Sequence, residues 1–155
     1  SEVGIFNGEG YHEDQVDNNG MSLEWRATAH IMGINGKDKQ TKKTYWDASF
    51  FGQLNQKHKA SADGIVGDYD DLYFYGIHTV YNQPAFLVAA QYIYSEDTAS
   101  NNTYVSAQAG DGYSINGEFR FGRDYKYTTL ARYDSWTSKK LNSTDELEKK
   151  TITAG

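Results

Sequence analysis

Residues Ser22 to Ile31 alternate between apolar and polar side chains without a break, and no other feature of the chain constrains the fold as strongly. One side carries Leu23, Trp25, Ala27, Ala29 and Ile31, and the other carries Ser22, Glu24, Arg26, Thr28 and His30. A period of two places successive side chains on opposite faces of a β-strand, whereas a helix would spread these apolar residues around its axis. The segment therefore predicts a strand with one apolar face and one polar face.

Similar alternation recurs along the chain, in segments of strand length. These are Val3–Tyr11, Thr44–Asn55, Asp71–Tyr81, Ala85–Tyr94, Gly112–Phe121, Tyr127–Trp136 and, much shorter, Thr151–Gly155. Long polar connections roughly alternate with short ones such as Asn35-Gly36 and Asn82-Gln83-Pro84, which have turn chemistry. We count about seven strands and the start of an eighth that is too short to span a membrane, where a tilted strand needs ~9–11 residues.

Strands of this length, joined alternately by short and long connections, are typical of outer-membrane barrels. We therefore expect an all-β fold, an antiparallel up-and-down transmembrane β-barrel. Residues 1–155 would form a single, incomplete segment of it, with seven to eight strands of a larger barrel.

Composition excludes several classes of function. The chain has no cysteine, and its net charge of −6 comes from 15 basic and 21 acidic residues, without the basic cluster that nucleic-acid binding requires. We find no nucleophile motif and no carboxylate pair singled out by its context, so we expect neither an enzyme nor a cofactor. The mean hydropathy of −0.75 fits a barrel, because only alternate residues of a barrel strand face lipid.

Two stretches resemble a known family. Val3 to Tyr11 reads Val-Gly-Ile-Phe-Asn-Gly-Glu-Gly-Tyr and resembles the "G-hydrophobic-x-N-G-x-G" segment of the phosphate-selective porin O and P family. Leu130 to Trp136 resembles its "L-x-A-R-Y-D" strand, and Thr151 to Gly155 stands where that family opens a strand with "T-x-G".

The resemblance implies a barrel of roughly 16 or 18 strands, usually trimeric, that passes small anionic solutes through the bacterial outer membrane. This chain would be about its C-terminal half, without the closing strands. The net charge of −6 departs from the basic lining that anion selectivity requires.

Charged and polar residues on the polar sides of the strands are candidates for the lining of a pore. They are Glu24, Arg26, His30, Glu118, Arg120, Arg132 and Asp134. Rings of charge in a water-filled lumen decide which ions pass. The alternative interpretation is that these residues form ordinary ion pairs across strands.

Aromatic residues near strand ends or on the apolar sides are candidates for a girdle at the membrane–water interface. They are Trp25, Trp46, Tyr75, Tyr92, Tyr94, Tyr113 and Tyr133. The alternative interpretation is the aromatic core of a soluble barrel or sandwich.

Metal binding has little support. Asp68-Tyr69-Asp70-Asp71, after Asp63, could supply oxygen ligands to calcium, but a solvated acidic loop explains it more simply. His12, His30, His58 and His78 do not have the spacing of a zinc site.

We therefore predict a segment of an outer-membrane porin for passive diffusion of small solutes, anions among them. Its partners would be membrane lipid, lipopolysaccharide and further copies of the chain in a homotrimer. Two alternatives stay open: a soluble eight-stranded barrel that binds a small apolar ligand, as lipocalins do, and a barrel that is a scaffold for a partner protein.

Overall fold

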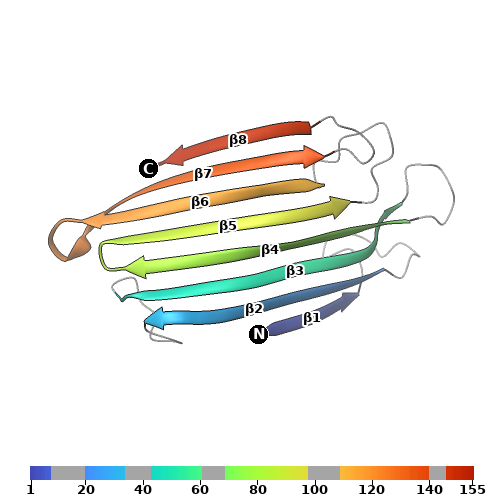
Figure 1. Ribbon diagram of the computed structural model, residues 1–155, viewed down its shortest axis with the longest axis horizontal. Coiled ribbons are helices and arrows are strands. Elements are labelled where there is room, and N and C mark those ends of the chain that lie inside the picture. The colour runs from blue at the N-terminus through green and yellow to red at the C-terminus, as the bar shows by residue number, and fades with distance from the viewer. Residues whose placement is uncertain (8–19, 34–42, 61–68, 98–108, 140–145) are drawn as a thin grey trace.

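The computed structural model describes residues 1–7, 20–33, 43–60, 69–97, 109–139 and 146–155. These residues form β1 (Glu2–Asn7), β2 (Met21–Gly33), β3 (Tyr45–Ala60), β4 (Tyr69–Gln83), β5 (Phe86–Asp97), β6 (Gly110–Phe121), β7 (Tyr127–Lys139) and β8 (Glu146–Ala154). A short 3-10 helix, η2 (Arg123–Tyr125), lies between β6 and β7. All eight strands are antiparallel and follow chain order in one sheet (Figure 1). The prediction of an all-β, up-and-down antiparallel fold is confirmed.

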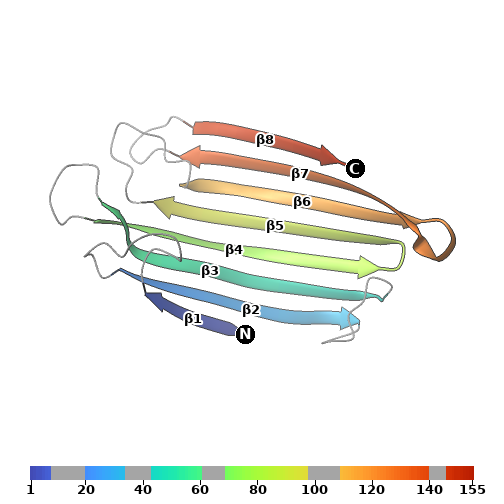
Figure 2. The ribbon, with the colours of Figure 1, turned by 180° about the vertical axis from the view of Figure 1, so that it is seen from behind.

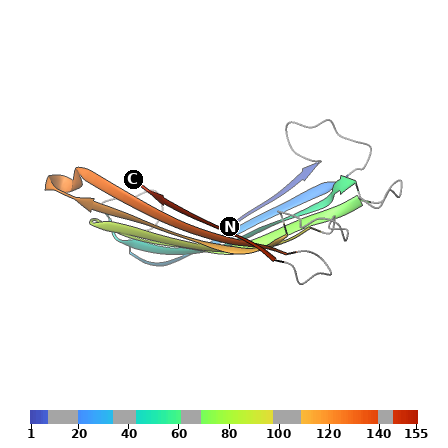
Figure 3. The ribbon, with the colours of Figure 1, turned by 90° about the horizontal axis from the view of Figure 1, so that it is seen from above.

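The sheet is open, with β1 and β8 at its two edges (Figures 1 and 2). Seen from above, the strands fan out because the sheet is twisted (Figure 3). Among the described residues, no helix has the length and apolar character needed to cross a membrane.

The eighth strand is longer than the sequence pattern predicts. β8 spans the 9 residues Glu146–Ala154 and pairs with β7 from Lys139 to Ala131. The prediction of only a short strand start at Thr151–Gly155 was wrong. The sequence pattern did not predict the first half of β8 because Glu146 to Lys150 is rich in charge and lacks a clear apolar alternation. Charged side chains are compatible with a strand at the edge of a sheet, where they face water.

Other strands also extend into segments that we expected to be loops. β3 continues to Ala60 and β4 begins at Tyr69, so Asp70 and Asp71 belong to a strand and not to an acidic loop. Between β2 and β3 a bulge follows His30, so that Met32, not Ile31, lies opposite Trp46. The bulge ends the strict alternation that the sequence shows up to Ile31.

Two short connections lie at the same end of the sheet (left in Figure 1). β4 and β5 are joined by Pro84 and Ala85 alone, with Gln83 paired to Phe86, and η2 joins β6 to β7. Asn82 therefore belongs to β4 and not to the predicted turn. The Asn35-Gly36 turn lies outside the described residues.

The strand register separates the side chains into two faces. We call the face that carries Trp25, Phe50, Ile77, Tyr92 and Ile115 the apolar face, and the opposite one, with Arg26, Ser49, His78, Gln91 and Ser114, the polar face. Each face covers all eight strands, because partner residues in an antiparallel pair point to the same side. Large apolar side chains are exposed on the apolar face, with Ile77 60% and Phe119 54% exposed.

Three cross-strand pairs place an aromatic ring over a glycine. Trp25 lies opposite Gly52, Phe51 opposite Gly76 and Trp136 opposite Gly112. A Cβ atom at Gly52 would lie 2.2 Å from Cζ2 of Trp25, and one at Gly76 would lie 2.9 Å from Cζ of Phe51. These glycines let the rings lie against the sheet, an arrangement that compensates for the missing glycine side chain.

We expect Gly52→Ala to lower the free energy of unfolding by about 1–3 kcal/mol, because its methyl group would overlap the Trp25 ring. That methyl group would also lie 2.7 Å from the backbone oxygen of Phe74, which cannot move without shifting β4. Equilibrium urea unfolding followed by tryptophan fluorescence measures the change.

Gly117→Ala is the matched control, since a Cβ there has 3.9 Å of space to its nearest neighbour, the oxygen of Leu87. We expect it to leave stability unchanged or raise it by up to about 1 kcal/mol, because alanine restricts the unfolded chain. Equal losses in the two variants would contradict the role given to the Trp25 ring.

Candidate functional site

The polar face is the candidate functional surface. All seven predicted lining residues, Glu24, Arg26, His30, Glu118, Arg120, Arg132 and Asp134, lie on it by register. One row of direct partners crosses from β2 to β8 and is polar at every strand: Thr28, Ser49, His78, Gln91, Ser114, Asp134 and Thr151. The structure thus brings together residues that are more than 100 positions apart in the chain.

Most charges on this face have a partner nearby. Arg132 Nε donates to both carboxylate oxygens of Asp134 at 2.9 Å, along one strand. His30 Nδ1 and an Asp47 oxygen lie 2.9 Å apart across β2 and β3. The alternative interpretation, ordinary ion pairing, therefore applies to these residues. Arg132 differs from the predicted cross-strand pairs in that its partner, Asp134, lies two positions along the same strand.

Arg120 is held more tightly than the others and is only 5% exposed. Its Nε donates to Glu118 at 2.6 Å, its Nη1 to the carbonyl of Gln83 at 3.0 Å, and its Nη2 to the side chain of Asn82 at 3.0 Å. Arg120 therefore secures the β4–β5 turn against β6. Arg120 was a candidate for the pore lining, with ordinary ion pairing as the alternative interpretation. Its bond to Glu118 agrees with the alternative, and a role in a lumen stays a prediction.

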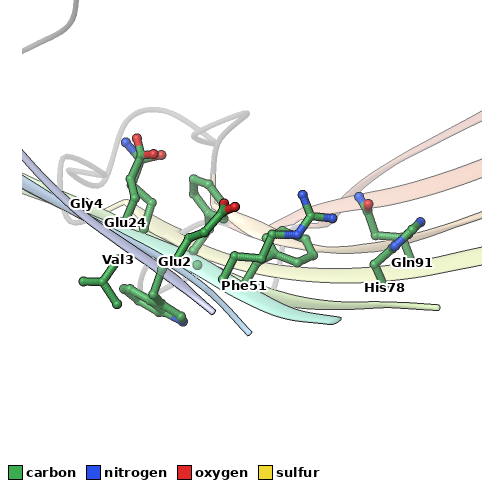
Figure 4. Close-up of a pocket in the computed structure, with 12 residues that line it drawn as sticks. Glu2, Val3, Gly4, Glu24, Phe51, His78 and Gln91 are labelled. Carbon is green, nitrogen blue, oxygen red and sulfur yellow. The ribbon is translucent and has the colours of Figure 1, made fainter. Parts of the chain in front are cut away.

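Glu24 and Arg26 line a hollow on the polar face, with a volume of about 560 Å³. Glu2, Phe51, His78 and Gln91 contribute to the same hollow (Figure 4). Figure 4 shows Glu2, Glu24, His78 and Gln91 on one side of the sheet and Val3 on the other. The sequence contains no signal for Gln91 or His78 here, because only the register places them beside Arg26.

The predicted girdle residues all lie on the apolar face, where they belong to two separate bands. The first aromatic band is Trp25, Tyr75, Tyr92, Tyr113 and Tyr133, and the second aromatic band is Trp46, Tyr81, Phe86, Phe119 and Tyr127. Tyr94 extends the first band, and its hydroxyl and that of Tyr73 both donate to Glu96. Sequence reasoning identified only Trp46 of the second band, although on β4 to β7 the residues of this band lie six positions from those of the first.

Two residues of the apolar face separate the bands on each strand from β3 to β7. We call these ten residues the apolar belt: Ala48, Phe50, Ile77, Thr79, Val88, Ala90, Ile115, Gly117, Thr129 and Ala131. None of them is charged. The apolar face also carries charged residues, but they lie beyond the first band, on the side away from the belt. They include Glu96, Asp111, Glu148 and Lys150.

The described residues contain no group of three or more acidic or histidine side chains that could hold a metal ion. His30 bonds to Asp47 and to the carbonyl of Gly33, and His58 lies in β3. Asp63, Asp68 and His12 lie outside the described residues.

Comparisons with protein-family models, with curated proteins and with solved structures gave no match for this chain. The resemblance to the porin O and P family stays a prediction. We therefore infer function from the two faces of the sheet.

We expect Arg120→Gln to lower the free energy of unfolding by about 2–4 kcal/mol, because Glu118, the Gln83 carbonyl and Asn82 all lose a charged donor. Arg132→Gln removes an arginine that is 55% exposed, and we expect a loss below about 1 kcal/mol. Urea unfolding of the two variants measures the difference. A loss at Arg132 as large as that at Arg120 would contradict this assignment.

Proposed function

We propose that this chain forms part of the wall of a porin-type channel in the bacterial outer membrane, through which small polar solutes diffuse. One observation carries the proposal: two aromatic bands enclose an uncharged belt on one face, while the opposite face carries charged side chains at the level of that belt. Membrane barrels have this layout, with aromatic girdles at both interfaces and a polar interior.

The bands run obliquely across the strands, and their slope supports the proposal. Tyr75 lies opposite Tyr94, so the first band moves two residues to reach Tyr92, which lies opposite Tyr113. The second band makes the same steps, since Tyr81 lies opposite Val88, two residues from Phe86, and Phe86 lies opposite Phe119. Both bands shift by two residues again between β6 and β7.

A plane that cuts tilted strands produces such a shift. Each band moves four residues over the four steps from β3 to β7, all of it over the last three steps. With a rise of about 3.3 Å per residue and about 4.8 Å between strands, this corresponds to a strand tilt of roughly 35–42°. Membrane barrels have a tilt of about 35–45°.

The distance between the two bands also fits the thickness of the apolar zone of a membrane. Tyr94 extends the first band, and Phe121, which stacks on Phe119 and Tyr127, extends the second. Measured to these outer rings, the bands are eight residues apart, from Tyr94 to Phe86 on β5 and from Tyr113 to Phe121 on β6. Eight residues span about 26 Å along a strand, or roughly 20 Å of height at this tilt, close to the ~25 Å apolar zone of membrane barrels.

The polar face would then line the lumen. At the level of the belt it carries His30, Asp47, Asn116, Arg132 and Asp134, where the charges are largely paired. A lining of paired charges, in a chain with a net charge of −6, favours general diffusion over strong anion selection.

Lipid and lipopolysaccharide would cover the apolar face, and the porin resemblance further implies a homotrimer. In a bilayer the open edges of β1 and β8 must be paired, because unpaired backbone groups are costly there. The proposal therefore includes further strands that close the barrel.

Substitutions at two adjacent residues of β6 test whether the apolar belt faces lipid. We expect Ile115→Arg to destabilise the bilayer-reconstituted protein by about 2–4 kcal/mol, because the arginine would face lipid. Asn116→Arg, one residue along and on the polar face, should change stability by less than about 1 kcal/mol. Equal effects, or a full-length protein that stays monodisperse without detergent, would contradict the membrane assignment.

Channel activity is tested in planar bilayers with the full-length protein in a salt gradient. We expect stepwise conductance, and we expect Arg26→Glu to shift the reversal potential toward cation selectivity, because residue 26 faces the lumen. Lys150→Glu makes the same charge change on the apolar face and should shift the potential much less. Absence of conductance steps would overturn the proposal.

A further inference from the structure

The hollow on the polar face combines a flat ring with polar side chains. Phe51 contributes a ring, and Glu2, Glu24, His78 and Gln91 stand around it (Figure 4). Arg26 and Phe74 also line the hollow. The hollow has a volume of about 560 Å³, which lies within the range of sites that bind small molecules.

Gly76 gives the Phe51 ring its position. Phe51 and Gly76 are direct partners on β3 and β4, and Cζ of Phe51 occupies space within 2.9 Å of the Cβ position that Gly76 lacks. The ring therefore lies against the sheet and not upright on it. A ring in this position presents a broad aromatic surface to the hollow.

The polar side chains around the ring differ from those on the rest of the polar face. Elsewhere Arg120, Arg132 and His30 are bonded to neighbouring carboxylates. Within the described part of the chain, the side chains of Glu24 and Arg26 form no hydrogen bond or ion pair, and the same is true of the side chains of Glu2, His78 and Gln91. Their donors and acceptors are available to a solute.

The chemistry of the hollow indicates the class of that solute. Two carboxylates accept hydrogen bonds, Arg26 donates, and the amide of Gln91 does both. Sugar hydroxyl groups donate and accept, so a neutral sugar can satisfy this mixture without bringing a net charge. The C–H groups on one face of a sugar ring carry slight positive charge, which suits the negative face of an aromatic ring.

We propose that this hollow is a binding subsite for neutral sugars, in which the sugar ring stacks on Phe51 and its hydroxyl groups bond to Glu24, Arg26 and Gln91. This rests on the proposed function in that the polar face must be open to solutes. An anionic solute fits less well, because Glu2 and Glu24 outnumber Arg26.

Binding is tested with the full-length protein in detergent, by saturation-transfer NMR with maltotriose as the probe. We expect saturable binding that Phe51→Leu weakens about three- to tenfold, because leucine keeps the apolar bulk and removes the aromatic face. Trp136→Leu is the matched control, since Trp136 also lies over a glycine on the polar face but outside the hollow, and it should leave binding unchanged.

A second pair of variants tests the polar contacts. Glu24→Ala should weaken maltotriose binding at least threefold, whereas Glu148→Ala, on the opposite face, should not. Both side chains are exposed, so neither variant depends on the fold.

Three results would overturn the proposal: no saturable maltotriose binding, equal binding by Phe51→Leu and the unchanged protein, or tighter binding of glucose 6-phosphate than of glucose. Because binding is measured in detergent and conductance in bilayers, failure of this subsite would be distinguishable from failure of the channel.

Discussion

Backbone hydrogen bonds hold each strand of this sheet to its neighbours, and the register of those bonds decides which side chains meet. A shift of one residue between β4 and β5 would move Tyr92 and Val88 to the polar face and expose Gln91 on the other. The register is therefore what assembles the two aromatic bands, the apolar belt and the polar row from residues scattered along the chain. Side-chain contacts in turn fix the register, as when the guanidinium of Arg120 bonds to β4 on one side and Glu118 on the other.

Glycines opposite aromatic rings give the sheet much of its surface shape. Trp25 over Gly52 continues the first aromatic band onto β3, where the glycine itself has no side chain. On the polar face the same arrangement lays Phe51 down beside Gly76 and Trp136 beside Gly112. An aromatic ring over a glycine thus compensates for the destabilising effect of glycine within a strand, and it also creates a flat aromatic surface on each face. The subsite that we propose depends on this local packing and not on any residue motif.

Periodicity in the sequence was sufficient to predict the central parts of most strands, their antiparallel order and the face of every candidate residue. Ile115 and Asn116 illustrate why, since neighbouring residues in a strand must point to opposite sides. Sequence could not predict the partners. The burial of Arg120 depends on Asn82 and Gln83, nearly forty positions earlier, and the second aromatic band becomes visible only when Tyr81 and Phe119 are placed on aligned strands. The sequence pattern also did not predict the start of β8, because the charged segment Glu146 to Lys150 lacks the apolar alternation of the other strands.

The distribution of burial gives the membrane proposal its physical basis. Among the described residues, the buried apolar side chains are Ala89 and Ala109, while Phe50, Ile77, Ile115 and Phe119 are about half exposed. Covering apolar surface contributes about 25 cal/mol per Å², so a sheet with so little interior needs cover from outside. A soluble eight-stranded barrel would place the apolar face inside, but an interior of that size is just wide enough for ordinary side chains, and this face carries aromatic rings on every strand from β2 to β7. Lipid places no such limit on ring size, and the uncharged belt lies where lipid would be deepest.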